Sequence, residues 1–243
     1  MKFAITFALL MIFSGVSTAQ TEPKDSLTSE RNYNCSFDNK NRNDFAFKRL
    51  ILPVALITTG SVAINRLDNG KANKFNQPAK YLFYEKLSGN HIHIDDVIQY
   101  APALAYLSIG GKEKFTDRLL KTATAGIICW GLTAPLKEIA GETRPDLSAD
   151  NSFPSGHTAT AFFGAELIRL SGHSIAITIP AYLTATAVGC LRIHNNRHWF
   201  CDVVAGAGFG ILSARVAHWL LPLEKRLFSG KEKGKTKIAQ ICY

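Results

Sequence analysis

Five long stretches without a charged side chain constrain the fold of this chain more than any other feature. They cover residues 50–65, 97–111, 122–136, 174–191 and 203–214, and they are rich in Ala, Leu, Ile and Gly. Because apolar and polar positions do not alternate strictly, helices are favoured over strands. Residues 157–170 form a further candidate helix. We therefore predict an all-α fold, a bundle of about six core helices that associates with a membrane.

The lengths of these stretches leave the number of membrane crossings open. About 20 residues are needed to cross the hydrocarbon layer, and only residues 174–191 approach that length. In the last stretch, Gly206, Gly208 and Gly210 lack side chains and would let another helix approach closely.

The first 19 residues are typical of a secretory signal. Met1 and Lys2 precede a largely apolar run over residues 3–16, and small residues follow at 17–19. We interpret residues 1–19 as a signal peptide, with an uncleaved signal anchor as the alternative, and expect export to a bacterial-type cell envelope. The net charge of +9 favours anionic partners. Export argues against nucleic acid as that partner.

The remaining chain divides by composition. Residues 20–49 form a polar lead-in, residues 50–222 the helical domain and residues 223–243 a basic tail. The five cysteines are odd in number and show no CxxC spacing, so we assign no disulfide. His91 and His93 have a spacing seen in metal sites, but no third ligand is evident, and we interpret them as polar loop residues.

Three short segments carry side chains suited to phosphate chemistry, and the first runs from Lys137 to Pro145. Lys137 and Arg144 lie seven residues apart, about two helical turns. A helix continuing into an extended Arg-Pro corner could therefore aim both cations at one anion. Arginine offers a fork for phosphate oxygens, and lysine offers a point charge.

The second segment, from Pro154 to His157, precedes the candidate helix over residues 157–170. Free backbone N–H groups and the positive end of the helix dipole bind phosphate at such a place without a metal. Ser155 belongs to this turn, and Gly156 lets the backbone come close to the ligand.

The third segment runs from Arg192 to Asp202 and contains His198. His198 and Asp202 are four residues apart, so on a helix the carboxylate could bind one ring nitrogen while the other nitrogen faces a substrate. That arrangement orients a nucleophilic or basic histidine. Trp199 beside it is interpreted as a packing residue or an interfacial anchor.

Together the three segments resemble the signature of the type 2 phosphatidic acid phosphatase family, which is related to class A acid phosphatases and vanadium haloperoxidases. The signature reads Lys-x6-Arg-Pro, Pro-Ser-Gly-His and Ser-Arg-x5-His-x3-Asp. The chain matches it at every position except one, where Leu191 replaces serine. The resemblance covers residues 118–222 well, and ten prescribed residues in three ordered blocks rarely arise by chance.

The resemblance implies a helical phosphatase that hydrolyses a lipid phosphate or diphosphate, such as phosphatidic acid, undecaprenyl diphosphate or lipid A, through a phosphohistidine. In that scheme His198 attacks phosphorus, Asp202 holds the tautomer of His198, and His157 protonates the leaving oxygen. The implied phosphate-binding residues are Lys137, Arg144, Ser155, Gly156 and Arg192. The scheme uses no metal and no other cofactor.

Alternatives to this interpretation stay open. The chain could be a soluble periplasmic nonspecific acid phosphatase or phosphotransferase, a vanadate-dependent haloperoxidase, or a non-enzymatic helical envelope protein whose site has decayed, with Leu191 as the first sign. A cleaved signal followed by six crossings would turn Arg144 inward. We therefore expect either an inner-membrane-associated protein with its site facing the periplasm or a soluble periplasmic protein, with the oligomeric state open.

Overall fold

The computed structural model describes the backbone over residues 39–64, 73–87, 92–109 and 113–240, and side chains over 48–64, 73–87, 92–109 and 113–225. The described residues form helices, turns and no strand, which confirms the all-α prediction. The longer helices are α2 (Asn39–Val62), α5 (Ala101–Ser108), α6 (Phe115–Ala140), α7 (Gly156–Leu170), α8 (Ile175–His194) and α9 (Phe200–Gln240). The short ones are α3 (Gln77–Lys80), the π-helical turn η2 (Tyr81–Glu85) and α4 (Asp95–Ile98).

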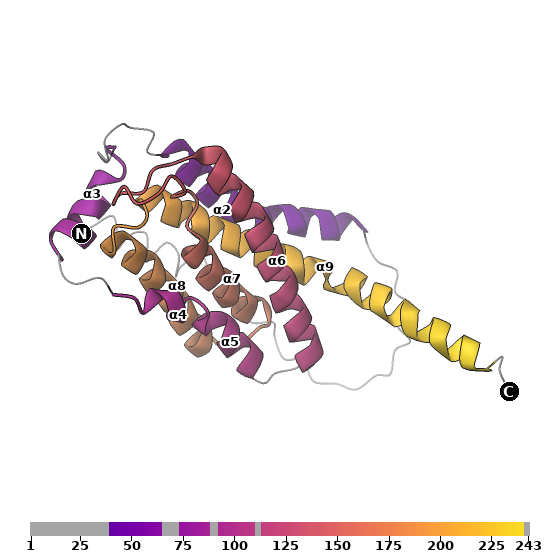
Figure 1. Ribbon diagram of the computed structural model, residues 1–243. Coiled ribbons are helices and arrows are strands. Elements are labelled where there is room, and N and C mark those ends of the chain that lie inside the picture. The colour runs from indigo at the N-terminus through magenta and orange to yellow at the C-terminus, as the bar shows by residue number, and fades with distance from the viewer. Residues whose placement is uncertain (1–38, 65–72, 88–91, 110–112, 241–243) are drawn as a thin grey trace.

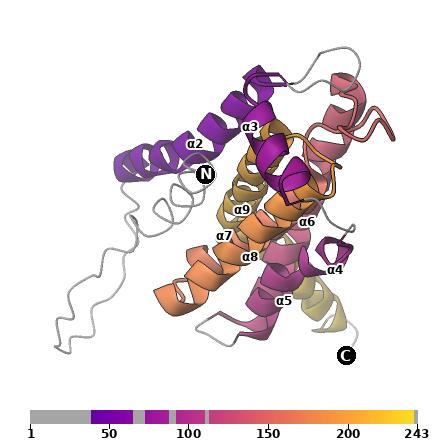
Figure 2. The same ribbon diagram turned by 90° about the vertical axis from the view of Figure 1, so that its left-hand side faces the viewer.

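Helix α7 is the central element of the bundle. It packs against α5, α6, α8 and α9, as Figures 1 and 2 show from two directions. Most of its side chains are buried, and Phe162, Leu167 and Ile168 are fully so. A helix that is buried on most of its faces belongs in the middle of a bundle. The N-terminus of α7 therefore lies at one end of the bundle, next to the start of α9.

Glycines in α9 allow this close packing, as the sequence predicts. A Cβ atom on Gly206 would lie 2.5 Å from the Ser155 carbonyl oxygen, and one on Gly210 would lie 2.3 Å from the Ala159 carbonyl oxygen. The first contact is with the residue directly before α7, and the second is with the first turn of α7. Gly208 faces the opposite direction, where a Cβ atom would lie 2.9 Å from the Pro53 carbonyl oxygen of α2. The glycine face of α9 therefore fixes the position of the N-terminal half of α7.

Helices α6, α7, α8 and α9 run alternately up and down the bundle. The C-terminal ends of α6 and α8 and the N-terminal ends of α7 and α9 consequently meet at one end of the molecule (Figure 1). At that end, the Ser155 N–H donates to the Asp202 carbonyl oxygen over 3.1 Å. At the other end, Lys225 of α9 forms a 2.5 Å ion pair with Asp117 of α6. All three phosphate-suited segments lie at the first of these ends.

Three of the described helical segments are long and apolar enough to cross a membrane: Phe115–Ala140, Ile175–His194 and Phe200–Lys225. The expectation that only residues 174–191 approach this length was wrong, because α6 and α9 extend beyond the uncharged stretches into residues that carry charges. In the stretch 97–111, in contrast, the described residues 97–109 contain no long helix. Within them α5 spans eight residues, about 12 Å at 1.5 Å per residue.

The ends of the chain bear on the predicted domain division. The predicted signal segment, residues 1–19, and most of the polar lead-in lie outside the described residues. Helix α9 passes through Pro222 and continues to Gln240, so the predicted boundary at residue 222 falls inside a helix. The division of the chain into these segments stays a prediction.

Candidate functional site

The first segment adopts the path that its sequence predicts. Helix α6 ends at Ala140, and Gly141 follows in the left-handed conformation, with φ 54°, where its N–H donates to the Lys137 carbonyl oxygen. Glycine is favoured at this position because it lacks a Cβ atom. The chain then leaves the helix toward Arg144, and the Trp199 indole N–H holds it by donating to the Thr143 carbonyl oxygen over 2.9 Å. Trp199 is buried and is therefore a packing residue.

Both cations of this segment lie at the site end of the bundle. The Lys137 ammonium donates to the Asn151 carbonyl oxygen over 2.8 Å, which uses one of its three N–H groups. The Arg144 Nε atom is buried and has no hydrogen-bond partner among the described residues. Burial lowers the pKa of Arg144, and the positive charges of Arg197 and Arg192 act in the same direction. These positive charges therefore lie close enough to repel one another.

The second segment forms the start of α7. Ser155 is the residue before the helix and is fully buried, with its Oγ atom 2.9 Å from the Thr158 Oγ1 atom. Because the Ser155 N–H already donates to Asp202, the Ser155 amide is not available to a ligand. A Cβ atom on Gly156 would meet nothing within 4 Å, so the backbone is open there. The first N–H groups of α7 have no partner within the helix and can bind an anion at this opening.

The third segment places His198 two residues before the start of α9, and not on a helix as the spacing predicts. Asp202 is the third residue of α9, and its Oδ2 atom accepts the Trp199 N–H over 2.8 Å. A side chain at this position that reaches back to the preceding N–H begins the helix there. The His198 Nδ1 atom still lies 3.5 Å from Asp202 Oδ2. The two residues therefore stay neighbours without the helix, although their distance is longer than that of a hydrogen bond.

Burial dominates the electrostatics of His198. It lowers the pKa of His198 to about 4, and the positive charges of Lys137 and Arg192 add to the shift, whereas Asp202 opposes it. The imidazole is consequently neutral at neutral pH and carries a lone pair on one nitrogen. A neutral imidazole is the form that can attack an electrophile.

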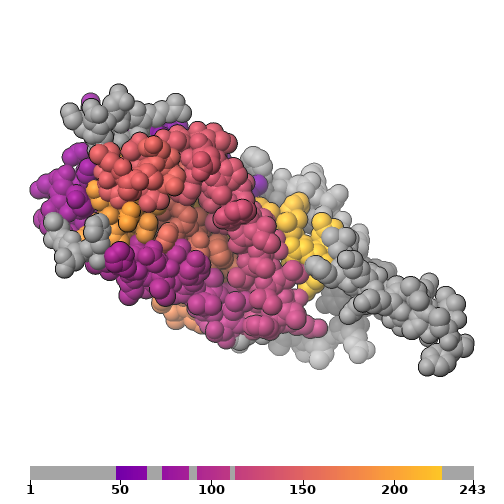
Figure 3. Space-filling view, in the orientation of Figure 1, coloured from indigo at the N-terminus to yellow at the C-terminus, as the bar shows by residue number. Residues whose placement is uncertain are grey.

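Arg192 connects the two histidines. Its positive charge lowers the pKa of His198 and also that of His157, although burial is the larger cause at both. The Arg192 Nε atom is buried and, like Arg144 Nε, has no hydrogen-bond partner among the described residues. On the face shown in Figure 3, the loop after α6 and the α4–α5 segment flank the segment between α8 and α9. The structure therefore brings the three predicted segments together at one place.

Sequence reasoning missed several polar partners at this site. The Ser152 hydroxyl donates to Asp202 Oδ2 over 2.5 Å, and Ser152 is fully buried. Asp95 and Asp96 begin α4, where Asp95 pairs with Arg192 and Asp96 lies 2.9 Å from the His157 Nε2 atom. The sequence signal for Asp95 and Asp96 was their place in a polar segment directly before the apolar helix α5. This signal did not link them to the site, because the three-part signature contains no residue before Lys137.

Leu191 does not leave Arg192 without support. The Arg192 Nη1 atom lies 2.6 Å from Asp95 Oδ2, and both side chains are buried. The Asn195 amide also lies 3.3 Å from Asp95 Oδ2. The Asp95 carboxylate therefore orients the Arg192 guanidinium in this chain, which has Leu191 instead of the signature's serine before Arg192.

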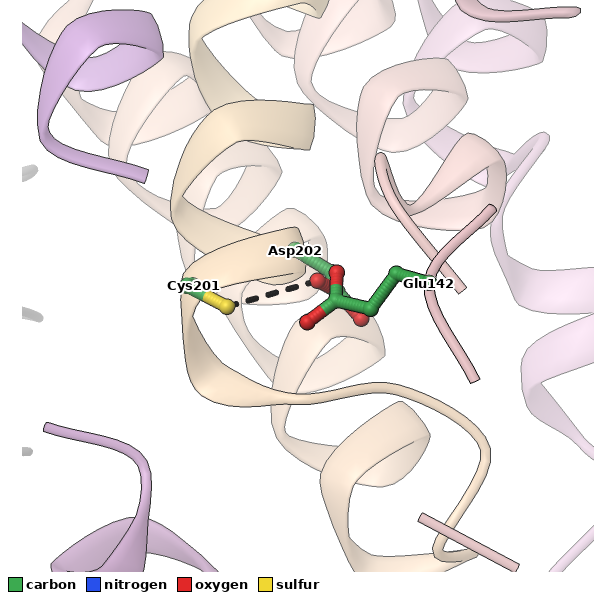
Figure 4. A group of neighbouring side chains, drawn as sticks. All are labelled: Glu142, Cys201 and Asp202. Carbon is green, nitrogen blue, oxygen red and sulfur yellow. Dashed lines mark hydrogen bonds between the residues drawn. The ribbon is translucent and has the colours of Figure 1, made fainter. Parts of the chain in front are cut away.

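Glu142, Cys201 and Asp202 form a buried group whose ligand atoms lie within 4.8 Å of one another, as metal ligands would (Figure 4). The Cys201 Sγ atom lies 3.4 Å from Asp202 Oδ1, in a hydrogen bond that a thiol can donate and a thiolate cannot. Metal binding requires the thiolate. The other carboxylate oxygen of Asp202 already accepts two hydrogen bonds. The donor set therefore fits a hydrogen-bonded cluster better than a metal site.

The remaining histidines and cysteines have local roles. His93 is exposed, with its Nδ1 atom 4.0 Å from Asp96 Oδ2, whereas His91 lies outside the described residues. His194 Nδ1 contacts the Phe83 carbonyl oxygen at 2.8 Å. Among the described cysteines, Cys129, Cys190 and Cys201 form no disulfide.

Comparisons with known proteins agree with the three-part signature. Residues 117–226 match the model of the PAP2 superfamily. The lipid A 1-phosphatase of Porphyromonas gingivalis is 38% identical over 141 residues, which cover 55% of this chain and 32% of that protein. Lipid phosphate phosphatase 1 of Arabidopsis thaliana is 32% identical over 108 residues, which cover 39% of this chain and 30% of that protein. The chain thus spans about a third of the length of these relatives.

One solved structure is similar to part of this chain. The crystal structure of Aquifex aeolicus LpxE is 22% identical, covers 60% of this chain and 95% of that chain, and superposes with a TM-score of 0.47.

Proposed function

We propose that this chain, whose residues 117–226 belong to the PAP2 superfamily, is a phosphatase that hydrolyses phosphate esters of lipids. One observation carries the proposal: the charge of Arg192 acts on both His157 and His198, while buried Nε atoms of Arg144 and Arg192 have no protein partner among the described residues. Two imidazoles and several cations thus surround one place. A tetrahedral phosphate supplies the negative oxygens that such donors bind.

In the proposed reaction the two histidines have different roles. The lone pair of His198 Nε2 forms a bond to phosphorus, and the electron pair of the breaking P–O bond goes to the leaving oxygen. His157 gives that oxygen a proton, so the lipid leaves as an alcohol. Water then attacks phosphorus, His157 takes a proton from it, and the P–N electron pair returns to His198. Asp202 stabilises the imidazolium while it is phosphorylated.

The protonation states fit this reaction once a phosphate is bound. His198 is already neutral because of its burial. Burial and Arg192 also lower the pKa of His157, which opposes its role as an acid, whereas Asp96 and Asp95 raise it. A bound dianion raises the pKa of a nearby imidazole by favouring its charged form. The substrate itself therefore helps to protonate His157.

A lipid substrate is supported by the surface beside the site. Exposed apolar side chains on α6 include Ile127, Trp130 and Ile139, and only 22% of the apolar part of this helix is buried in the bundle. Such a surface suits lipid chains better than water. The names of the two curated relatives also refer to lipid phosphates.

We further propose that the site faces the outer side of the membrane. At the end of the bundle away from the site, Lys114 and Arg118 lie at the start of α6, and Lys225 lies far along α9. Basic residues are enriched on the cytoplasmic side of membrane proteins. If that end is cytoplasmic, the site at the opposite end opens to the periplasm.

The test is phosphate release from a panel of lipid phosphates by the purified full chain in detergent micelles. Wild type should release phosphate, and His198→Ala should lose at least about a thousandfold in kcat, because nucleophilic attack is removed. The matched control is His173→Ala, which lies in the turn after α7 at the far end. Equal loss in both variants, or no release by wild type, would contradict the proposal.

Two further measurements sharpen this test. Activity should survive EDTA, because the transition-state charge is balanced by protein cations. Equal kcat/KM for p-nitrophenyl phosphate and for lipid phosphates would instead indicate a nonspecific acid phosphatase.

A further inference from the structure

Hydrogen bonds and an ion pair join the short helix α4 and the residue Ile92 before it to the C-terminal end of α8. The side chain of Asn195 accepts the Ile92 N–H over 3.0 Å and donates to the Ile92 carbonyl oxygen over 2.8 Å. Asp95, the first residue of α4, is 1% exposed and pairs with Arg192 over 2.6 Å. In each of these contacts, the residue from the α4 region lies outside residues 117–226 and its partner lies inside. The contacts place Asp96, the second residue of α4, next to the site.

The carboxylate of Asp96 lies between groups of two other helices. Its Oδ1 atom is 2.9 Å from the His157 Nε2 atom and 3.6 Å from the Arg192 Nη1 atom. The contact with His157 has the length of a charge-assisted hydrogen bond, and the contact with Arg192 is longer. The pKa of Asp96 lies below its ordinary value, mainly because of this hydrogen bond. Asp96 is therefore ionised and accepts a hydrogen bond from His157 Nε2–H.

We propose that Asp96 is a positioning residue for His157, which it holds in the tautomer that presents Nδ1 to the substrate. This proposal rests on the phosphatase function proposed above. The site then contains two carboxylate–imidazole pairs: Asp202 with His198, through Nδ1, and Asp96 with His157, through Nε2. The two carboxylates belong to different helices, α9 and α4, and contact opposite nitrogens of their rings.

For the reaction, the consequence is that one proton of His157 stays on Nε2, next to Asp96. With Nε2–H bound to Asp96, the proton delivered to the leaving oxygen comes from Nδ1, and the electron pair of the broken P–O bond takes it up. The charged groups that face His157 are Arg192 from α8 and Asp95 and Asp96 from α4. Arg192 disfavours the imidazolium, and the two carboxylates favour it. Removal of the Asp96 charge should therefore lower the pKa of His157.

The decisive experiment varies the leaving group. A lipid alcohol leaves poorly and needs a proton, whereas p-nitrophenolate is stable without one. Asp96→Asn should lower kcat about 10- to 100-fold for a lipid phosphate, but less than about threefold for p-nitrophenyl phosphate. The control Glu85→Gln removes one exposed carboxylate on η2 and should change neither value. Asp96→Glu, which keeps the carboxylate, should recover part of the loss.

The pH dependence gives a second readout that a purely structural role would not change. For the lipid phosphate, the high-pH limb of kcat/KM should move to lower pH in Asp96→Asn, while the low-pH limb stays in place. NMR titration of the His157 ring, assigned with His157→Ala, should show the same fall in pKa without any turnover. This titration separates the two proposals, because it can succeed in a protein that releases no phosphate.

Three results would overturn the role of Asp96 while leaving the phosphatase function standing. They are an equal loss of kcat on both substrates, an unshifted His157 titration, or a gain in kcat together with tighter inhibition by inorganic phosphate. The last would mean that the carboxylate competes with phosphate for Arg192 and His157. Absence of phosphate release by wild type would instead contradict the function itself.

Discussion

At the scale of single residues, the two imidazoles of the site differ in their surroundings. The His198 side chain is 3% exposed and contacts the Asp202 carboxylate, whereas the His157 side chain is 27% exposed and faces Asp96. Burial therefore lowers the pKa of His198 further, to about 4, than that of His157. His198, which must be neutral, and His157, which must carry a proton, therefore differ in burial as well as in their carboxylate partner.

These shifts predict a bell-shaped dependence of kcat/KM on pH. Activity should rise as pH increases through about 4, where His198 becomes neutral. With a further increase in pH, activity should fall as the free enzyme's His157 loses its proton. This falling limb should lie at a pH lower than the ordinary histidine pKa of about 6.5. In kcat the falling limb should lie at higher pH, because bound phosphate raises the pKa of His157. Since the substrate phosphate also titrates near pH 6, His157→Ala is the control. A falling limb that persists in His157→Ala would belong to the substrate.

Ser152 offers a test of the Asp202 environment. Ser152→Ala removes a 2.5 Å hydrogen bond to the carboxylate, and bonds to charged groups contribute about 1.5–3 kcal/mol. We expect kcat to fall about tenfold or more with little change in KM, measured by steady-state kinetics on a lipid phosphate. Ser108→Ala, exposed on α5, is the control. A change in KM alone would mean that Ser152 acts on binding and not on His198.

At the scale of elements, the site is built where helices begin. The N-terminus of α7 supplies the opening at Gly156, and the first turn of α9 supplies Asp202. Gly206 sets the distance between these two helix starts, because its missing side chain admits the Ser155 carbonyl oxygen. The relative position of α7 and α9 is therefore coupled to the geometry of the site.

Gly206→Ala should disturb both stability and activity. The added Cβ atom would lie 2.5 Å from a backbone oxygen, so the helices must separate, at a cost of about 1–3 kcal/mol. We expect a lower unfolding temperature in detergent and a lower kcat. Gly126→Ala is the matched control, because a Cβ atom there meets nothing within 4 Å and alanine favours the helix by up to about 1 kcal/mol. A Gly206 variant as stable as this control would refute the coupling.

At the scale of the whole molecule, polarity separates along the bundle. The described cationic and histidine side chains of the site gather at one end, and basic residues such as Lys114 and Lys225 lie toward the other. Between the ends, outward positions on the longer helices are apolar, among them Trp130 of α6 and Trp219 of α9. This distribution is the one expected of helices that cross a bilayer with polar groups at both surfaces.

The three tryptophans can test this placement. Trp130 and Trp219 are 73% and 70% exposed, whereas Trp199 is 2% exposed. In vesicles containing brominated lipids, single-tryptophan variants that keep Trp130 or Trp219 should be strongly quenched, and one that keeps Trp199 should not. Carbonate extraction at alkaline pH should leave the full chain in the membrane fraction. Release into the soluble fraction, or equal quenching of all three, would argue against a membrane-spanning bundle.

The sequence by itself determined the helical class, the segment that matches the PAP2 superfamily model and the identity of the residues in the three motifs. Those features are local, because uncharged stretches favour helices, and motif spacing is visible along the chain. The capping residue after α6 and the close approach at Gly206 were also predictable from such local chemistry. The motif residues themselves could be named without coordinates, but their roles in catalysis stay proposals.

Only the tertiary structure decided which groups surround those residues. It placed His198 before α9 instead of on it, assigned the Ser155 amide to Asp202, and brought Asp95 and Asp96 of α4 to Arg192 and His157. Asp96 and His157 are 61 residues apart in sequence. No periodicity links positions so distant. Their contact depends on how the bundle packs around α7, and burial and partner charges, which set the pKa of each histidine, exist only after that packing.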